Sequence, residues 1–155
     1  MSFSMFGGDI AAKQAALDKS QAIIEFNMDG TIITANANFL AAMGYSLDEI
    51  RGKHHSMFVD PAYRDSAEYR EFWVKLNRGE FQAGQYKRIG KGGKEVWIEA
   101  SYNPIMDLNG RPWKVVKFAT DLSKRKEANL QLARDFETAE SAQMVGDELR
   151  VEQAI

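Results

Sequence analysis

The chain has 155 residues, of which 45% are hydrophobic and 11% aromatic, and this suits one domain with a packed core plus additional segments. Its net charge of −2 indicates no basic surface for nucleic acid, and its lack of cysteine excludes disulfides, thiolate zinc sites and cysteine nucleophiles. No apolar run approaches the ~20 residues of a membrane-spanning helix, and no secretory signal is present, so we expect a cytoplasmic protein without a membrane span.

The first segment, residues 1–20, is predicted to contain a short helix. Asp9 can cap it, and the residues that follow carry a weak apolar stripe that includes Leu17. A helix this short is marginal in isolation, so we expect it to pack on another surface.

Residues 22–36 are predicted to form a hairpin that leads into a helix. From Ala22 to Met28 every second residue is apolar, which is the period of a strand that buries one face. Asp29-Gly30 supplies a tight turn, because glycine accepts the positive φ that such turns need. The β-branched residues 31–35 form the return strand, and Asn36 caps the next helix.

Short helices are expected after the hairpin, over residues 36–43, from Ser46, and after Asp60-Pro61. A longer helix is predicted over residues 66–77. Its apolar residues recur at i, i+3, i+4 and i+7, the spacing of one helix face, and they are Tyr69, Phe72, Trp73 and Leu76.

Three strands are expected next, over residues 81–89, 95–103 and 113–120, with a glycine-rich turn between the first two. In the second of these strands the residues of one face are Val96, Ile98, Ala100 and Tyr102, which leaves Trp97 on the other face. We expect Pro104 to end the regular pairing. Lys114 and Lys117 in the last strand indicate a sheet edge or a partly solvated face.

From residue 122 onward the composition changes to charged residues, glutamine and alanine, which predicts a helix that reaches about residue 151. Its apolar residues keep an interrupted 4-3 spacing, typical of a short irregular coiled coil: Leu132, Phe136, Ala139, Ala142, Val145 and Leu149. Such a helix usually pairs with another, so a homodimer is expected.

Three motifs in this order resemble those of the PAS family. NMDGTIITANANF resembles its opening hairpin, GYSLDEIRGK a following helical segment, and VVKFATDLSKRK its last strand, which ends in a D-[IL]-[TS] signature at residues 121–123. The resemblance implies an α+β PAS fold, with a five-stranded antiparallel sheet and short helices on one face. The domains expected are an N-terminal cap helix (1–20), the PAS sensor domain (21–122) and an output coiled-coil helix (123–155).

The stretch from GKHHSMFVDP to KVVKFATD more narrowly resembles the cytoplasmic N-terminal PAS modules of bacterial methyl-accepting chemotaxis proteins, including aerotaxis-type receptors. This resemblance implies a sensor of redox state, oxygen or a small ligand. The event in its pocket would be relayed to the C-terminal helix of a dimer, and from there to a downstream receptor signalling domain.

Trp73 resembles the tryptophan of flavin-binding aerotaxis-type PAS domains, and His55 and Met57 align with a similar HxM stretch. An isoalloxazine ring needs flat apolar walls and a few hydrogen-bond donors, which Trp73, Asn36, Tyr86 and Arg88 can supply. The resemblance also places Ile98 and Ala100 on the inner face of the sheet, where they leave room for a ligand. FAD is therefore the first cofactor predicted. The alternative is that Trp73 is a core aromatic beside an empty or small-ligand pocket.

The pair His54-His55 offers haem b as a second cofactor, because neutral imidazole is a common axial ligand of haem iron. Some haem-binding PAS domains take this ligand from the long helix, but residues 66–77 contain no histidine. The alternative is that both histidines hydrogen-bond to the backbone and shape the mouth of the pocket.

The sequence shows no catalytic constellation and no metal-ligand cluster, so we expect no enzyme; a small flavin oxidoreductase is disfavoured because no nicotinamide-binding fingerprint is present. Two further functions fit the sequence. One is a cofactor-free PAS module that dimerises through Trp97, Leu17, Phe3 and the terminal helix. The second is the sensor of a histidine kinase or a diguanylate cyclase.

Overall fold

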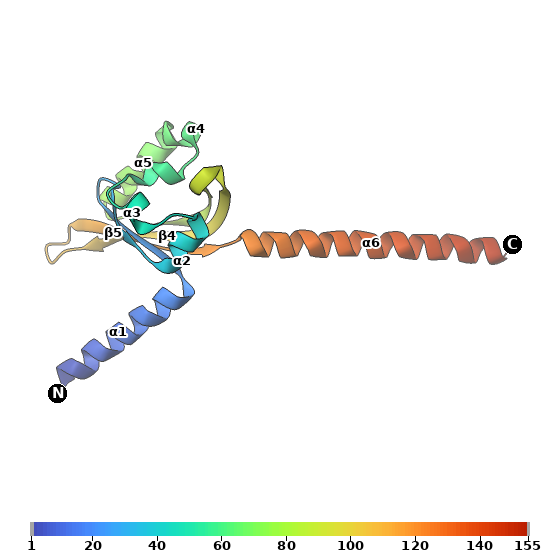
Figure 1. Cartoon of the computed structure of the whole chain (residues 1–155), viewed down its shortest axis with the longest axis horizontal. Coiled ribbons are helices and arrows are strands. Elements are labelled where there is room, and N and C mark those ends of the chain that lie inside the picture. Colours follow the sequence, from blue (N-terminus) through green and yellow to red (C-terminus); the bar gives the residue numbers. More distant parts are fainter. Residues whose placement is uncertain (1, 155) are drawn as a thin grey trace. The chain divides into compact units, whose positions relative to one another are not determined.

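The computed structural model describes the backbone of residues 2–154 and the side chains of residues 7–123, 125 and 127–145, so the side chain of Phe3 lies outside the described residues. The chain divides into two compact units, Met1–Asp121 and Leu122–Ile155. The first contains a five-stranded sheet of order β2-β1-β5-β4-β3 (Figure 1), in which every neighbouring pair is antiparallel. The strands are β1 Ala22–Asn27, β2 Ile32–Ala35, β3 Gln82–Ile89, β4 Glu95–Met106 and β5 Pro112–Asp121.

Short helices lie over one face of this sheet (Figure 1), as predicted, and we call it the inner face. The helices of the chain are α1 Ser2–Ser20, α2 Ala37–Met43, α3 Leu47–Ile50, α4 Pro61–Arg64, α5 Ala67–Asn77 and α6 Ser123–Ala154, with the 3-10 turns η1 His55–Phe58 and η2 Lys91–Gly93. The inner face carries the buried alternate residues of three strands: Ile24 and Phe26 of β1, Val96, Ile98, Ala100 and Tyr102 of β4, and Val115, Lys117 and Ala119 of β5.

The predicted hairpin turn is confirmed. The Asp29 carboxylate accepts hydrogen bonds from the backbone N–H and the hydroxyl of Thr31, at 2.9 and 2.6 Å. Gly30 has φ 89°, and a Cβ there would lie 2.5 Å from Nε2 of His54. Only glycine fits both the conformation and the space.

The caps predicted at Asn36, Gly44 and Ser46 are confirmed, but the cap predicted at Asp9 is wrong, because α1 begins at Ser2 and Asp9 lies inside it. The Asn36 side chain accepts from the N–H of Phe39 at the start of α2, and Gly44 ends that helix in the left-handed conformation. Glu49 accepts from the N–H of Ser46 before α3. Ser66 accepts from the N–H of Tyr69 at 3.1 Å, so α5 begins one residue after it.

Two expectations for the strands were wrong. β5 is a central strand between β1 and β4, so it is not an edge, and Lys117 is buried on the inner face. Lys114 is half-buried on the other face, which agrees with the alternative of a partly solvated face. Pro104 does not end the pairing, because β4 continues beside β5 as far as Met106. β3 ends opposite Tyr102, so beyond that point β4 has a neighbour on one side only, where a residue without an N–H is tolerated.

On the opposite, outer face of the sheet, α1 borders a groove of about 1040 Å³ whose walls include Leu17 and Trp113. The side-chain amides of Asn36 and Asn38 donate to backbone carbonyls at the end of α1, which holds this end beside α2. Trp97 lies half-buried on the face opposite Val96 and Ile98, as expected from the alternation.

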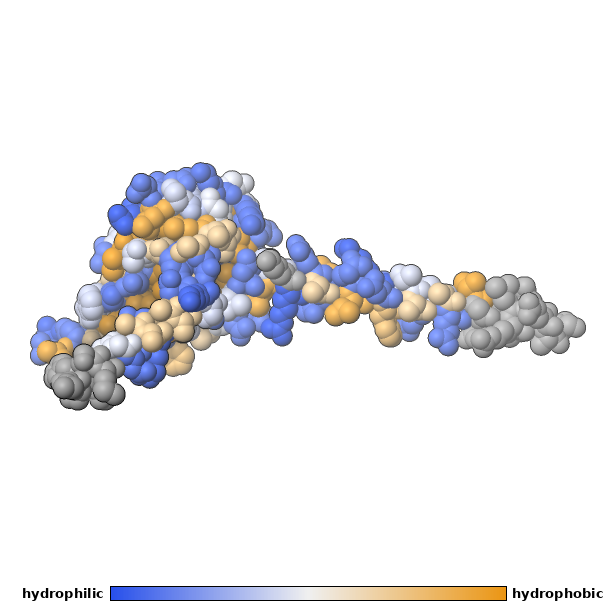
Figure 2. Space-filling view, turned by 60° about the horizontal axis from the view of Figure 1, so that its bottom comes forward, coloured by the Kyte–Doolittle hydropathy of each residue, from blue (hydrophilic) through white to orange (hydrophobic). Residues whose placement is uncertain are grey.

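The second unit consists of α6. Hydrophobic side chains lie exposed among hydrophilic ones along this helix (Figure 2), and the large ones are Leu130, Leu132, Phe136, Met144 and Val145. Leu149, which the predicted coiled-coil spacing includes, has its side chain outside the described residues. Among the described residues, none of the helices has the length and apolar character needed to cross a bilayer.

Candidate functional site

A hydrogen-bonded cluster lies buried between α5 and the inner face of the sheet. His55 opens η1 with none of its surface exposed, and its Nδ1 lies 2.7 Å from the hydroxyl oxygen of Tyr69. Its Nε2 lies 3.1 Å from the hydroxyl oxygen of Tyr102, which also accepts hydrogen bonds from Nη2 and Nε of Arg88 at 2.9 and 3.3 Å. We call these four residues, His55, Tyr69, Arg88 and Tyr102, the inner cluster.

The direction of its hydrogen bonds follows from Arg88, which can only donate. The Tyr102 oxygen accepts from Arg88, so its own proton is free to be donated to Nε2 of His55. Nδ1 of a neutral His55 then carries the ring proton and donates to Tyr69. The cluster is thus a continuous chain of donors and acceptors from β3 to α5.

The electrostatics favour neutral forms in this cluster. Burial lowers the pKa of His55 well below its usual value, and the positive charges of Arg88 and Lys117 lower it further. Burial raises the pKa of Tyr102, with Arg88 opposing the rise, and burial also raises the pKa of Tyr69 to about 12. At neutral pH His55 is therefore uncharged and the tyrosines keep their protons.

Lys117 lies beside this cluster on β5, with only 1% of its surface exposed. Its Nζ lies 4.8 Å from the ring centroid of Tyr102 and 5.6 Å from that of Phe39. Burial and the nearby charge of Arg88 lower the pKa of Lys117 well below its usual value. In the described part of the chain, no carboxylate forms an ion pair with Lys117 or with Arg88.

Trp73 adjoins the inner cluster from α5. Its ring meets those of His55 and Phe26 edge to face, at centroid distances of 5.6 and 5.9 Å. Its indole N–H is buried and makes no hydrogen bond of normal geometry among the described residues, although it lies close enough to the Tyr69 hydroxyl to lower the pKa of Tyr69 against the effect of burial. An unsatisfied buried donor in a folded protein calls for an explanation, and a ligand oxygen is one.

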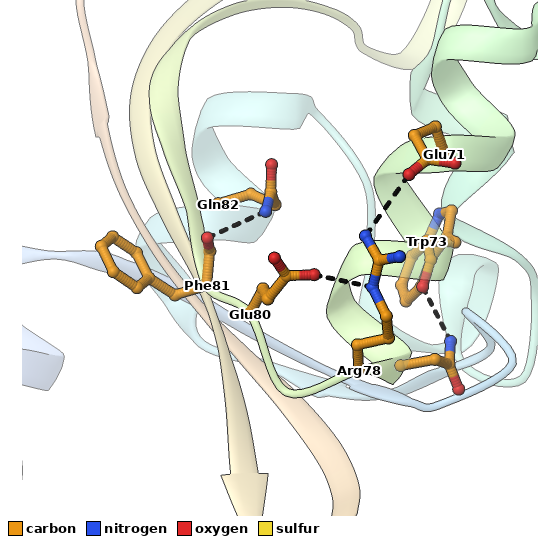
Figure 3. Close-up of polar contacts among 7 residues, drawn as sticks. Glu71, Trp73, Arg78, Glu80, Phe81 and Gln82 are labelled. Atoms are coloured by element: carbon orange, nitrogen blue, oxygen red, sulfur yellow. Dashed lines mark hydrogen bonds and ion pairs between the residues drawn. The ribbon is translucent and has the colours of Figure 1, made fainter.

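A cleft of about 720 Å³ opens beside α5, and Trp73 and Tyr69 form part of its wall. Its lining combines one side of α5 with the β1–β2 turn, the start of η1 and the end of α4: Asp29, His54, Ser56, Arg64, Tyr69, Arg70, Trp73, Val74, Asn77 and Arg78. At the end of α5 (Figure 3), the guanidinium of Arg78 lies 2.8 Å from Glu80 and 3.5 Å from Glu71. The charge of Arg78 is therefore already balanced by carboxylates.

The residues predicted for flavin binding are not all in one place. Trp73 lines the cleft, and His55 lies buried behind it. Met57 is half-buried in η1. Three further predicted residues, Tyr86, Ile98 and Ala100, share the inner face with Arg88, whose Cζ lies 4.7 Å from the centroid of the Tyr86 ring.

Asn36 lies apart from all of these. Its carbonyl accepts from the N–H groups of Ile23 and Phe39, and its amide donates to the backbone of Gln21 and to Asp18. It borders the outer groove. The structure gives Asn36 a capping and anchoring role, and a contact with flavin stays a prediction.

Both candidate haem ligands have their ring nitrogens engaged. Nε2 of His54 lies 2.9 Å from the carbonyl oxygen of Asp29, and its Nδ1 accepts from the N–H of Ser56 at 3.0 Å. His55 contacts two tyrosine hydroxyls. Ligation of iron would displace one of these bonds, and it stays a prediction. Across the described side chains, no group of three His, Cys, Asp or Glu residues is arranged to hold a metal ion.

Sequence reasoning missed the polar roles of Tyr69 on α5 and of Tyr102 and Lys117 on the inner face. The signal for Lys117 was its alternation with Val115 and Ala119, both of which are buried. That signal was weak, because Val116 and Phe118 make the other face of β5 equally apolar.

Comparisons with known proteins agree with this geometry. Residues 32–119 match the family model described as PAS fold. The Biofilm dispersion protein BdlA of Pseudomonas aeruginosa is 48% identical over 117 residues, which cover 76% of this chain and 28% of that protein. The Aerotaxis receptor of Escherichia coli is 30% identical over 80 residues, which cover 52% of this chain and 16% of that receptor. The chain thus spans well under a third of the length of these relatives.

Solved structures support the fold alone, because their sequence identity is low. A PAS domain from Colwellia psychrerythraea superimposes with a TM-score of 0.64 at 24% identity, over 74% of this chain and 98% of that one. A light-oxygen-voltage domain studied with a flavin analogue gives 0.62 at 19% identity, over 82% of this chain and 96% of that one. Both likenesses rest on the arrangement of sheet and helices.

Proposed function

Because the chain belongs to the PAS fold family, we propose that it is the sensory module of a bacterial chemotaxis or energy-taxis receptor. It would sense redox state, oxygen or a small ligand at the inner face and relay the event to a downstream signalling domain. The likeness to proteins named an aerotaxis receptor and a biofilm dispersion protein supports this proposal. We propose a cytoplasmic, non-enzymatic role.

The observation that carries the proposal is the place of the inner cluster. Tyr102 of β4 lies directly opposite Lys117 of β5, and β5 runs on to Asp121, two residues before α6 begins. A change at the hydroxyl of Tyr102 therefore acts on the strand that the output helix follows in the chain. Signalling would be a shift in population between two packings of the inner cluster.

We propose FAD as the first cofactor to test, and the residues present fit it in part. The indole of Trp73 and the apolar part of the wall of the 720 Å³ cleft, which Tyr69 and Val74 complete, suit a planar heterocycle that carries carbonyl oxygens, although the other lining residues are polar or charged. Asn36 does not line this cleft. When bound, a flavin supplies a reversible redox change. The protein's part would be to exclude water with Trp73 and Tyr69 and to register the change at His55 and Arg88.

We further propose that the module works as a homodimer through its N-terminal and C-terminal helices. The exposed apolar residues of α6 and the groove beside α1 support this. A second candidate function is the sensor of a histidine kinase, which is favoured by 33% identity over 122 residues to the Two-component system protein A of Emericella nidulans. A cofactor-free dimerisation module is the third.

The first test is the absorption spectrum of the freshly purified protein, repeated on the supernatant after heat denaturation. Flavin bands would support the redox sensor, and Trp73→Phe should then weaken flavin retention. A Soret band would favour haem and make His54 and His55 the variants of choice. A protein that stays colourless after reconstitution with both cofactors would contradict the cofactor proposals and leave the small-ligand or dimerisation module.

A further inference from the structure

Two cationic side chains are buried on the inner face without a counterion among the described residues. Arg88 is 3% exposed and Lys117 is 1% exposed. Charged side chains are almost never buried to this degree unless they are paired. The donors of Arg88 go to the Tyr102 hydroxyl and to the Lys87 carbonyl, both of them neutral groups. Nζ of Lys117 faces aromatic rings.

The arginines of the cleft differ in this respect. Arg78 pairs with Glu71 and Glu80, and Arg64 lies 3.6 Å from Asp65. Their charges are balanced by carboxylates. Arg70, the third arginine of the cleft, forms no ion pair with the described residues but is exposed to water, whereas Arg88 on the inner face has neither a carboxylate partner among them nor water around it. An anion at the inner face would therefore compensate the charge of Arg88 and favour the protonated form of Lys117, whose pKa burial and Arg88 lower.

Small residues cross the sheet between the positions of Arg88 and Tyr102. Gly84, Ala100, Ala119 and Ala22 lie opposite one another across four adjacent strands and form a row of small residues. Along the β3–β4 pair, Arg88 lies on one side of this row and Tyr102 on the other, yet their polar ends meet at 2.9 Å. The two side chains therefore reach toward each other above this part of the sheet, where the ring of Tyr86 lies close to Gly84.

We propose that Arg88 and Lys117 form the anion-recognising half of the ligand site, and that the ligand carries a carboxylate or phosphate group which lies over this row. The inference deepens the proposed sensory function and rests on it. On binding, Arg88 transfers its hydrogen bonds from Tyr102 to the anion, and this leaves Tyr102 and His55 to rearrange. The anionic group belongs either to a cofactor, as a flavin phosphate or a haem propionate, or to a free small carboxylate.

The test compares ligands that differ in charge and little else: FMN with riboflavin, haem with its dimethyl ester, and succinate with succinamide. Dissociation constants are measured by spectral titration for the coloured ligands and by calorimetry for the others. We expect the anionic member of at least one pair to bind at least about tenfold more tightly. The pair that shows this preference identifies the source of the anion.

Variants then assign the preference to the buried cations. Lys117→Met and Arg88→Met should each bring the two members of that pair to similar affinity. Lys94→Met, which removes an exposed lysine from the β3–β4 connection, should leave the preference unchanged. Circular dichroism checks folding, and if Arg88→Met fails to fold, Lys117→Met decides alone.

Equal affinity within every pair, binding by none of the anionic members, or a preference that survives in Lys117→Met would each overturn the inference. Its failure is distinguishable from failure of the proposed function. An anion that binds through Lys117 without any effect on α6 would refute the relay and leave the binding site standing.

Discussion

Tyr102 joins the two polar side chains of the inner face, because its single oxygen contacts both Arg88 and His55. Tyr102→Phe keeps the ring and removes that oxygen, so a buried guanidinium and a buried imidazole lose a partner. We expect the free energy of unfolding to fall by about 2–3 kcal/mol. Urea denaturation followed by tryptophan fluorescence measures it.

Tyr45→Phe is the matched control, since the ring of Tyr45 packs on Phe58 and its hydroxyl is not part of the inner cluster. It should change stability much less. Equal effects of the two substitutions would mean that the inner cluster adds nothing beyond ring packing.

Because Lys117 is buried, we expect the free energy of unfolding to depend on pH in an unusual way. Its pKa is lowered in the folded protein, so the unfolded chain binds the proton more readily below pH 10.5. Stability is therefore lost as pH falls from 10.5 toward the folded pKa. Lys117→Met removes this loss and should stabilise the ligand-free protein.

The measurement is the difference in unfolding free energy between the two proteins at several pH values from about 8 to about 10. Over the pH range in which unfolding takes up one proton at Lys117, this difference should grow by about 1.4 kcal/mol for each unit by which the pH is lowered. A flat difference, or a less stable Lys117→Met protein, would show that Lys117 has an unrecognised counterion.

At the scale of elements, α5 positions Trp73 and Tyr69, and Ser66 caps its first turn. Ser66→Ala should lower the free energy of unfolding by about 1 kcal/mol. It should also weaken retention of any ligand held by Trp73. Ser141→Ala on α6 is the control, and a loss of equal size there would argue against a capping role for Ser66.

The proposed dimer depends on the apolar residues of α6. Phe136 is exposed, and a glutamate there would place a charge in the expected helix pair. Phe136→Glu should weaken the dimer by about 2 kcal/mol, or roughly 30-fold in Kd. Sedimentation equilibrium measures this. Arg134→Glu lies off the apolar stripe and should leave the dimer intact; equal weakening by both would contradict the predicted helix pair.

Most elements could be predicted because their signals are local. The Asp29-Gly30 turn, the Asn36 and Ser46 caps and the apolar stripe of α5 each depend on residues close together in the chain. Strand order is not local. The residues of β5 alone do not show that it pairs with both β1 and β4, and this is why Lys117 was expected at an edge or on a partly solvated face.

The candidate site was predictable only in part for the same reason. Trp73, His55 and Arg88 were named, but the link from Arg88 to His55 runs through Tyr102, 14 residues from Arg88 and 47 from His55. Such a link arises from the register of β3 with β4. The capping role of Asn36 could be predicted from its neighbours in the chain. The same residue was also predicted to contact flavin, and the two predictions conflict.

At the scale of the whole molecule, the fold combines a buried polar cluster, a central strand that contacts it through Lys117, and a helix that follows that strand in the chain. This arrangement gives a ligand event on the inner face a covalent route to the C-terminal helix. The central claim is that the two are coupled.

The absence of native cysteine allows this coupling to be measured directly. A single spin label at Ser141→Cys in α6 reports the distance between the two helices of a dimer by pulsed electron–electron resonance. We predict that the distribution shifts on reduction with dithionite or on addition of saturating succinate, and that Arg88→Met abolishes the shift. A distribution that is the same under all these conditions would contradict the account.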